Sequence, residues 1–460
     1  MSSLNRKRSM FDLYIFTIII ASELLMSFTF LGYIHIPPVS ITFAYIPILI
    51  AAASLGTAQS TAIGFVFGLA SMYKASASYV MPMDMIFSPF YSGSPLQSLI
   101  LSIGTRTLFG FIIGLSFAAV KKTKKPRLYI GIISFIAPKL HDVIVYAAME
   151  LFFSDVLREN LGNAKLFGIK DILPVVLSVL SAELTMLIYN SRTVIKLKKD
   201  IDKSYEIPYI STKSKNIFLT VLNAFVLIMT LLSTMYFASR SLSMFEEYGM
   251  KLSSQVERDL IRLQLQFMLA MLSLYVISLV ILIFVYRKMT YQNFLGKLDA
   301  VTGVMGRRIF LENCAKITEN MSGNVTDDGW FLFADIDKFK NVNDTFGHAV
   351  GDLVLKETAR LLGDMFLDCG IVGRMGGDEF AVLISERTVT QNELSAKLDT
   401  LLSELSNIIP EKCKISCSIG ACHFAGNADV NDIAKVADRI LYEAKNKGRA
   451  CYVLGEYSAE

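Results

Sequence analysis

Two consecutive glycines followed by two carboxylates mark the segment of this chain where chemistry is most clearly indicated. Residues 374–380 read Arg-Met-Gly-Gly-Asp-Glu-Phe and lie between two short apolar runs. Glycine adopts positive φ at no steric cost, so this pattern predicts a β-hairpin with the glycines at its turn. Asp378 and Glu379 would then lie beside the turn, where carboxylate oxygens can bind a hard cation together with a phosphate.

A second polar cluster follows a predicted buried strand. The apolar run 330–334 leads directly into Asp335-Ile-Asp-Lys-Phe-Lys, and Asn343-Asp-Thr-Phe-Gly-His and Gly351-Asp follow, the latter opening a helical pattern. Further blocks are Asp299-Ala-Val-Thr-Gly-Val-Met-Gly-Arg-Arg, Cys417-Ser-Ile-Gly, Ala437-Asp-Arg, Ala444-Lys and Gly448-Arg. In this order and spacing, the blocks resemble the GGDEF family of diguanylate cyclases over about 160 residues, from Asp299 to the end of the chain.

This resemblance implies a fold and a reaction. The fold is a nucleotidyl-cyclase-like βαββαβ core, so the C-terminal part is expected to be an α/β (α+β) domain. The reaction joins two GTP molecules into cyclic di-GMP and pyrophosphate, by attack of each ribose hydroxyl on the other α-phosphate. Such an enzyme must neutralise triphosphate charge and activate a hydroxyl, and divalent ions held by carboxylates can do both.

The resemblance also assigns roles residue by residue. Asp335 and Asp378 are expected to bind Mg²⁺ (or Mn²⁺), with the Ile336 carbonyl as a further ligand. Glu379 is needed for turnover in the family, so Asp378, Glu379 and Asp335 are the expected catalytic residues. The expected substrate-binding residues are Asn343 and Asp352 for guanine, Lys445 and Arg449 for the terminal phosphates, and Lys338 and Phe339 through their backbone N–H groups. Arg374 and Asp344 would support them.

Single residues in this set also have ordinary structural interpretations. Asp352 alone could cap a helix, and Lys445 alone could be a solvated helix residue. One family element is missing: many relatives carry Arg-x-x-Asp five residues before the signature, where cyclic di-GMP binds and inhibits. Leu367 and Gly370 occupy the arginine and aspartate positions here, so the sequence predicts no product inhibition through this motif.

The rest of the chain is strongly apolar. Of the 460 residues, 53% are hydrophobic, and long apolar runs with few charges fill 11–192 and 216–286. A segment of about 20 apolar residues can cross the roughly 30 Å of bilayer hydrocarbon. The sequence therefore predicts a polytopic α-helical membrane region with about eight spans, at 11–32, 39–56, 59–79, 96–120, 129–153, 171–191, 216–237 and 267–286.

Basic residues set the predicted orientation. They cluster at 6–8, 121–127, 192–203 and 287–288, which all fall on one side if there are eight spans. The positive-inside rule makes that side cytoplasmic, so the predicted location is the inner (cytoplasmic) membrane with both termini in the cytoplasm, where GTP is available. The net charge of +4 is too small to indicate a nucleic-acid-binding surface. All six cysteines lie in the C-terminal third, as expected in a reducing cytosol.

The first six predicted spans have a character of their own. Residues 36–53, 55–56, 64–71 and 89–95, with the glycines of the fourth span, resemble the substrate-binding S component of ECF-type vitamin transporters, over about residues 10–195. The resemblance implies a small vitamin-like ligand. Ionisable residues inside spans are costly to bury, which makes them candidate ligand contacts. They are Glu23, Arg106, His141, Asp142, Glu150 and Glu183. The alternative is a structural pair between Arg106 and a glutamate.

The chain is therefore expected to be multi-domain. Its parts are a six-span membrane domain at 1–195, a two-span helical hairpin with a short extracytoplasmic segment at 196–286, a helical linker at 287–298 and the GGDEF domain at 299–460. Catalysis in the family joins two substrate-bearing domains, so a homodimer is expected. A candidate dimer seam at heptad-like spacing consists of Phe284, Tyr291, Leu295 and Leu298.

Three functions fit this organisation. The first is a membrane-bound diguanylate cyclase whose output is regulated by a small ligand in the membrane domain. The second is a catalytically quiet GTP-binding receptor whose signature serves as an interaction surface, and the third is a vitamin-uptake subunit with a regulatory GGDEF tail. The intact acids Asp335, Asp378 and Glu379 favour the first. Its expected partners are GTP, a second copy of the chain and the lipid bilayer.

Overall fold

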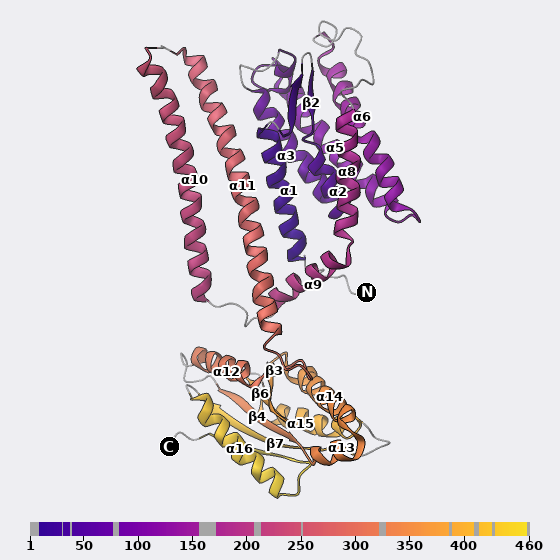
Figure 1. The fold of residues 1–460 in the computed structure, drawn as a ribbon, viewed down its shortest axis with the longest axis vertical. Coiled ribbons are helices and arrows are strands. Elements are labelled where there is room, and N and C mark those ends of the chain that lie inside the picture. The colour runs from indigo at the N-terminus through magenta and orange to yellow at the C-terminus, as the bar shows by residue number, and fades with distance from the viewer. Residues whose placement is uncertain are drawn as a thin grey trace. The chain divides into compact units, whose positions relative to one another are not determined.

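The computed structural model describes residues 9–29, 31–36, 39–76, 82–155, 172–206, 213–249, 252–321, 328–385, 389–408, 414–425 and 428–457. The chain divides into two compact units, Met1–Tyr291 and Gln292–Glu460 (Figure 1). The first is called the helical unit and the second the sheet unit. Each has its own cluster of buried hydrophobic side chains, so each packs around its own core.

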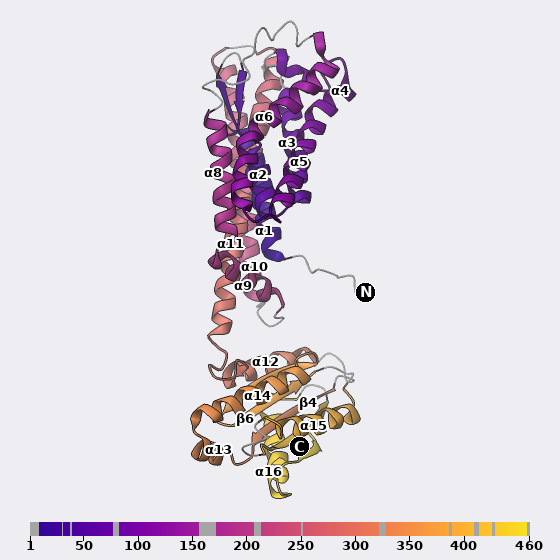
Figure 2. The ribbon, with the colours of Figure 1, turned by 90° about the vertical axis from the view of Figure 1, so that its right-hand side faces the viewer.

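The helical unit consists of helices and one short hairpin. In chain order its elements are α1 (Met10–Phe28), β1 (Tyr33–Ile36), β2 (Val39–Thr42), α2 (Ile46–Ser54), α3 (Thr57–Ala75), η1 (Pro82–Phe87), α4 (Pro95–Leu99), η2 (Ile100–Gly104), α5 (Thr105–Val120), α6 (Pro126–Phe152), α8 (Ile172–Tyr189), α9 (Arg192–Glu206), α10 (Lys213–Glu247) and α11 (Ser254–Leu295). Strands β1 and β2 pair antiparallel. The long helices α10 and α11 run in opposite directions (Figures 1 and 2).

Five helices of the described residues are long and apolar enough to cross a membrane: Met10–Phe28, Pro95–Val120, Pro126–Phe152, Ile172–Tyr189 and Ser254–Leu295. They coincide with the first, fourth, fifth, sixth and eighth predicted spans. The seventh coincides with α10, which contains a shorter apolar stretch, Asn223–Phe237. The third coincides with α3, which is helical over 19 residues but includes several polar side chains.

The second predicted span, 39–56, is wrong as a single helix. Val39–Thr42 is strand β2, and α2 covers only the nine residues Ile46–Ser54. The β-branched residues of Val39–Thr42 favour a strand, and a proline in the first turn of α2 marks the start of the helix, where its missing N–H costs no hydrogen bond. At a rise of about 1.5 Å per residue, α2 is too short to cross a bilayer.

Only part of the predicted dimer seam is free to contact a second copy of the chain. Helix α11 continues without a break to Leu295. However, the Phe284 ring lies 5.7 Å from the ring of Phe11 and 6.4 Å from the ring of Tyr14, both on α1. Tyr291 is buried as well, whereas Leu295 is exposed. Heptad-like spacing did not distinguish packing against α1 from packing against a second copy of the chain, and two of the four seam residues contribute to the helical unit instead.

The sheet unit contains β3 (Met305–Gly306), α12 (Arg307–Met321), β4 (Asp328–Ile336), α13 (Phe339–Phe346), α14 (His348–Phe366), β5 (Gly370–Gly376), β6 (Glu379–Ile384), α15 (Gln391–Leu405), β7 (Cys417–Ala425), α16 (Val430–Asn446) and β8 (Tyr452–Glu456). The strands form one six-stranded sheet in the order β3-β5-β6-β4-β7-β8. The central strand β4 is antiparallel to β6 and β7. The expected α/β sheet fold of the C-terminal part is confirmed.

The order of elements from β4 to β7 matches the expected βαββαβ pattern, with the first helix divided into α13 and α14. The predicted hairpin is formed by β5 and β6, which pair antiparallel. Gly377 lies in its turn with a φ of +49°, so the double glycine has the backbone conformation that the sequence predicted.

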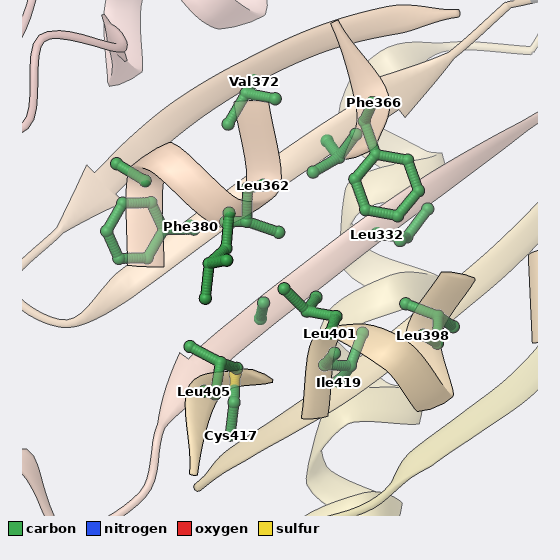
Figure 3. Close-up of a cluster of buried hydrophobic side chains, with 14 of the residues drawn as sticks. Leu332, Leu362, Phe366, Val372, Phe380, Leu398, Leu401, Leu405, Cys417 and Ile419 are labelled. Carbon is green, nitrogen blue, oxygen red and sulfur yellow. The ribbon is translucent and has the colours of Figure 1, made fainter. Parts of the chain in front are cut away.

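Alternation along β4 sends side chains to two differently covered faces of the sheet. Leu332 belongs to a buried cluster with Leu362 and Phe366 of α14 and with Leu398 and Leu401 of α15, so these two helices cover one face (Figure 3). The next residue, Phe331, points to the other face, where its ring lies 6.0 Å from Phe310 of α12. The face that carries Phe331 also carries Asp335, because residues two apart on a strand share a face.

Close packing of α16 on this second face depends on Gly420 in β7. A Cβ atom at this position would lie 2.3 Å from the Leu441 backbone nitrogen and 2.4 Å from the Ala437 carbonyl oxygen. Both are main-chain atoms of α16, so no side chain can move aside to make room. The absence of a side chain at Gly420 therefore sets how near α16, and the basic residue at its end, can come to the sheet.

We expect Gly420→Ala to destabilise the sheet unit by about 1–3 kcal/mol, because the added methyl group pushes α16 away from β7. Gly363→Ala is the matched control. Its Cβ would meet only the flexible Leu367 side chain at 3.3 Å, and alanine is favoured over glycine inside a helix. Urea unfolding of residues 292–460 measures both. Equal stability of the two variants would contradict the close-packing argument.

Candidate functional site

The pairing of β4 with β6 brings acidic residues from two distant segments together. Asp335 lies directly opposite Glu379 in the antiparallel register, so both side chains project from the same face of the sheet. Asp378 comes just before Glu379, and its carbonyl oxygen accepts a hydrogen bond of 3.3 Å from the Ile336 N–H. The three acids expected to be catalytic are therefore neighbours in the structure.

Helix α16 adds a positive charge to this acidic cluster. The Nζ atom of Lys445 lies 2.9 Å from Oδ2 of Asp335, whose side chain is only 13% exposed. Lys445 is in the last turn of α16, the helix that Gly420 allows to pack closely on the sheet. The lysine side chain is thus directed to the acidic cluster and not simply to solvent.

The acidic cluster is electrostatically unfavourable without a further cation. Burial raises the pKa of Asp335, Lys445 lowers it, and the neighbouring Asp378 and Asp337 carboxylates raise it, for a net upward shift. The pKa of Glu379 is also raised, first by burial and then by repulsion from Asp335 and Asp378. Carboxylates that repel one another in this way form a place where an added positive charge is stabilised.

A divalent ion fits this donor set. Asp335 and Asp378 offer carboxylate oxygens and Ile336 offers a main-chain carbonyl, all hard oxygen ligands. In the part of the chain that the structure describes, no group of three or more His, Cys, Asp or Glu side chains is arranged to hold a metal ion. Mg²⁺ commonly uses one or two carboxylates and completes its octahedron with phosphate oxygens and water. The donor set thus suits an ion bound together with a nucleotide.

The start of α13 supplies backbone donors just beyond the acidic strand. Lys338 is at the N-cap in the left-handed conformation, with φ 54°, and its carbonyl accepts a hydrogen bond of 2.9 Å from the Asn341 N–H. The first N–H groups of a helix have no partner within the helix and favour anions. The predicted phosphate donors at Lys338 and Phe339 therefore lie at a helix N-terminus, directly after β4.

The two residues expected to bind guanine lie on adjacent helices. Asn343 is on α13, and its amide oxygen is against Gly351 of α14, the residue before Asp352. The alternative role of Asp352 as a helix cap is wrong, because α14 begins at His348 with Gly347 at its N-cap. Asp352 is exposed on the helix surface. The Asn343 amide thus lies against the residue that precedes the solvent-accessible Asp352.

Arg374 connects the hairpin turn to the beginning of the sheet unit. Its Nη1 atom lies 2.9 Å from Oδ1 of Asp299, and its Nε and Nη2 atoms donate to the Gly377 carbonyl at 3.0 and 2.6 Å. Burial raises the pKa of Asp299, but hydrogen bonds from Thr302 and Arg374 outweigh it and lower the pKa below its usual value. Arg374 thus stabilises the hairpin turn, whereas its expected role in supporting the substrate-binding residues stays a prediction.

Comparison with known proteins assigns this unit to a family. Residues 296–451 match the family described as diguanylate cyclase, GGDEF domain. These residues form a GGDEF domain. A segment of 154 residues is 36% identical to the probable diguanylate cyclase DgcI of Escherichia coli (strain K12), covering 33% of this chain and 32% of DgcI. A segment of 172 residues is 28% identical to diguanylate cyclase DgcS of Shewanella oneidensis, covering 37% of this chain and 55% of DgcS.

The chain spans less than two thirds of the length of either curated relative. Among solved structures, the coiled coil and GGDEF domain of DgcB from Caulobacter crescentus, in complex with c-di-GMP, covers 37% of this chain and 92% of that chain. The identity is 20% and the TM-score is 0.34. The similarity to DgcI and DgcS covers 33% and 37% of this chain.

Asp337 is a residue of the GGDEF domain to which sequence analysis gave no role. Its carboxylate accepts hydrogen bonds of 2.7 Å from the hydroxyls of Ser416 and Ser418 and one of 3.0 Å from the Ala450 N–H. Arg449 and Ala450 both have positive φ, 65° and 52°. Asp337 therefore holds the segment that carries Arg449 in a conformation that non-glycine residues rarely adopt.

The sequence did contain a signal for this network. Asp337 is the second acid of Asp-Ile-Asp, and a buried carboxylate needs donors, which the serines on either side of Cys417 can provide. What the sequence did not show is that β7 lies beside β4, which brings Ser418 opposite Asp335 in the register. The partner strand had to be known before the serines could be paired with the acid.

We expect Asp337→Ala to lower the free energy of unfolding of the GGDEF domain by about 2–4 kcal/mol, because it leaves buried donors, including the Ser418 hydroxyl, without an acceptor. Asp368→Ala, at an exposed position, is the control and should change it by less than about 0.5 kcal/mol. Denaturant unfolding followed through Trp330 checks both variants. If Asp337→Ala lowered the free energy of unfolding no more than Asp368→Ala, the hydrogen bonds of Asp337 would contribute little to stability.

Proposed function

We propose that the chain is a membrane-anchored diguanylate cyclase that condenses two GTP molecules into cyclic di-GMP and pyrophosphate. The observation that carries the proposal is the cross-strand pair of Asp335 and Glu379 with Lys445 bound to Asp335, inside a GGDEF domain. The names of the curated relatives support it, since DgcI is named a probable diguanylate cyclase and DgcS a diguanylate cyclase.

The site residues divide the work of binding and activating GTP. The amide of Asn343 and the carboxylate of Asp352 suit the acceptor and donor edge of guanine. Lys445, Arg449 and the N–H groups at the start of α13 suit the negative charge of the triphosphate. Glu379 lies opposite Asp335 with a raised pKa, which suits a group that takes up a proton near the reacting hydroxyl.

Asp335, Asp378 and the Ile336 carbonyl would hold Mg²⁺ or Mn²⁺, which when bound neutralises phosphate charge and polarises the reacting groups. Lys445 would then exchange its contact with Asp335 for the terminal phosphates, since both are within reach of one flexible side chain. One GTP bound per domain means that the product forms only where two domains face each other. The proposed working form is therefore a homodimer.

We expect Glu379→Ala and Asp378→Ala each to reduce the rate of cyclic di-GMP formation about 10²–10⁴-fold, as loss of a positioned acid–base or metal-binding carboxylate does. The measurement is product formation by the purified full chain with GTP and Mg²⁺. Asp368→Ala is a matched control, because it removes an exposed carboxylate of the same domain outside the acidic cluster. Its rate should equal that of the wild type.

An unchanged rate in Glu379→Ala would contradict the assignment of the acidic cluster as the reaction centre. GTP binding without any turnover by the wild-type dimer would instead favour the quiet GTP-binding receptor. Both variants change a hairpin turn that is partly exposed, so their unfolding transitions should match that of the wild type. Comparison of those transitions separates loss of chemistry from loss of fold.

The helical unit is proposed to anchor the enzyme in the inner membrane with its termini in the cytoplasm. Five sufficiently long apolar helices among the described residues support this. The basic segment 121–127 connects α5 to α6 and 192–203 follows α8, while 287–288 lie inside α11, after its apolar run and eight residues or fewer from its end. The positive-inside rule expects such residues on the cytoplasmic side. We further propose that a small ligand bound within this unit regulates output, as the similarity to transporter S components suggests.

Product inhibition through the usual motif is not expected, for a structural reason as well as a chemical one. Leu367 is 60% exposed and offers no guanidinium. At Gly370, a Cβ atom would lie 2.1 Å from the Leu383 carbonyl oxygen, so an aspartate could not replace it without displacing β6. Both the arginine and the carboxylate that grip cyclic di-GMP are therefore absent from these positions.

We expect micromolar cyclic di-GMP to leave the initial rate of the full chain within about 20% of its value without product, because a missing charge-assisted pair weakens binding by at least tenfold. The measurement is pyrophosphate release over the first few per cent of turnover. Leu367→Arg should not restore inhibition, since Gly370 still lacks a carboxylate. A dose-dependent fall in the wild-type rate would reveal an inhibitory site elsewhere in the chain.

A further inference from the structure

Three ionisable side chains inside the helical unit are almost completely buried. Glu23 of α1 is 0% exposed, Arg106 of α5 is 7% exposed and His141 of α6 is 6% exposed. Each has at least one polar atom with no hydrogen-bond partner among the described residues: Oε2 of Glu23, Nε of Arg106, and both ring nitrogens of His141. Buried polar groups in native proteins normally have partners, so each of these atoms needs an explanation.

Arg106 is placed by an irregularity in its own helix. The segment Ile100–Gly104 is a π-helical turn inside the run from α4 to α5. The Leu101 carbonyl there accepts hydrogen bonds from Nη1 of Arg106 at 2.7 Å and from the Thr105 hydroxyl. One edge of the guanidinium is thereby fixed to the helix, while Nε is left without a partner. Single π-turns of this kind occur frequently at functional sites.

His141 follows a second irregularity, in α6. Pro138 lies inside this helix and has no N–H, so the Ser134 carbonyl lacks its usual helical donor. The hydroxyl of Ser134 is fully buried and also has no partner among the described residues. Ser134 and His141 are seven residues apart and so share one face of α6. This face therefore presents several unfilled hydrogen-bonding positions.

Aromatic side chains connect the arginine to the histidine. The His141 ring is stacked on Phe67 of α3, with centroids 5.8 Å apart and planes 24° apart. The Cζ atom of Arg106 lies 5.6 Å from the centroid of the same Phe67 ring. Arg106 also interacts electrostatically with His141 and with Tyr33 of β1, and Tyr33 interacts with Glu23. Phe67 therefore contacts both Arg106 and His141, and Tyr33 lies within electrostatic range of both Arg106 and Glu23.

The alternative of a structural ion pair between Arg106 and a glutamate is not what the structure shows. Glu183 pairs with Arg127 at 3.6 Å, and Glu150 is exposed. Glu23 accepts a hydrogen bond of 2.9 Å from Ser27, and among the described residues no ion pair joins it to Arg106. Glu23 and Arg106 thus do not neutralise each other by a direct ion pair, and Arg106 instead interacts electrostatically with Tyr33 of β1 and Asp84 of η1. Such an arrangement is costly unless something else completes it.

We propose that this region is a binding site for a small amphoteric molecule with an anionic or hydrogen-bond-accepting group at one end and a cationic or donating group at the other. Nε of Arg106 binds the acceptor end and Oε2 of Glu23 binds the donor end. The His141 imidazole, whose Nδ1 lies 3.6 Å from Oδ1 of Asp142, offers a ring nitrogen beside the Phe67 ring. Pro138 removes the helical donor of the Ser134 carbonyl, and irregular helices of this kind line binding sites in many membrane proteins.

The inference rests on the proposed ligand-sensing role of the helical unit, but its first test needs no known ligand and no GTP turnover. If the buried groups serve a ligand, they destabilise the empty protein, so neutral replacements should stabilise it. Arg106→Met and Glu23→Gln in the full chain in detergent, dialysed without additives, should each raise the Tm of the helical unit by about 2–4 °C. Far-ultraviolet circular dichroism follows this transition.

Ser98→Ala is the matched control for this test. Ser98 is also fully buried, but its hydroxyl donates to the Ile86 carbonyl and to Ser92, both at 2.6 Å. Its removal should lower the Tm, because a satisfied buried hydrogen bond is lost. A lower Tm in both Arg106→Met and Glu23→Gln would show that these groups are structural, and would overturn the proposal whatever the enzyme activity of the same preparations.

A second measurement tests access and charge preference with defined probes. Ser134→Cys, a nearly isosteric change, should react with sulfonatoethyl methanethiosulfonate, which is anionic, and with aminoethyl methanethiosulfonate, which is cationic. Adding Arg106→Met should slow the anionic reagent about tenfold, and adding Glu23→Gln should slow the cationic reagent about tenfold, since each removes the opposite charge that concentrates the reagent. The native cysteines all lie in the sheet unit. Their reaction with the reagents is measured on the chain without the added cysteine and is subtracted.

Ala137→Cys is the control for labelling. Ala137 and Ser134 are both fully buried on α6, but Ala137 belongs to the hydrophobic cluster of the helical unit, whereas Ser134 carries an unpartnered hydroxyl. Ala137→Cys should not react. Failure of Ser134→Cys to react with either reagent, or equal rates with and without Arg106 and Glu23, would overturn the proposal even if the Tm values rise. Labelling is independent of GTP turnover, so an inactive cyclase with a charge-selective site would disprove the proposed function alone.

Discussion

The antiparallel pairing of β4 with β6 is the constraint on which the proposed chemistry depends. It places Asp335 opposite Glu379 and brings Asp378 next to Ile336, so that like charges are held together by backbone hydrogen bonds. Burial and mutual repulsion raise the pKa of both Asp335 and Glu379. The hydrophobic core beneath, with Leu332 and Phe380 on the opposite face, supplies the stability against which this repulsion is set. In the proposed function, a divalent cation bound with the nucleotide phosphates would relieve this repulsion.

Lys445 and Asp337 connect the paired strands β4 and β6 to the rest of the domain. Gly420 lets α16 approach the sheet, which brings Lys445 to Asp335. Asp337, two residues beyond Asp335, binds Ser416, Ser418 and Ala450 and so fixes the backbone next to Arg449. Asp335 and Asp337, which lie two residues apart, thereby position two basic residues, Lys445 at the end of α16 and Arg449 in the following turn. The site is one connected unit, although its residues come from four strands and helices.

Sequence alone predicted the parts of this site that follow from local pattern. The double glycine indicated the hairpin, and the apolar run before Asp335 indicated the central strand, because both depend on a few adjacent residues. The role of Asp337 and the packing of Phe284 and Tyr291 against the chain itself were not predicted, since they depend on which elements become neighbours. The strand at Val39–Thr42 was missed because a continuous apolar run fits a helix or a strand equally well.

The same physical logic extends to the helical unit, where it leads to a different conclusion. In the GGDEF domain the unfavourable charges are neighbours with a basic partner, and they lie where the paired strands β4 and β6 meet the hairpin turn. In the helical unit Glu23 and Arg106 are buried and form no ion pair with each other, and Arg106 directly follows a π-helical turn. Desolvated charges without partners are tolerated only where binding is gained in return. Both units therefore retain local instability at the places where a ligand would relieve it, and this gives a ligand a means of changing the stability of the unit it occupies.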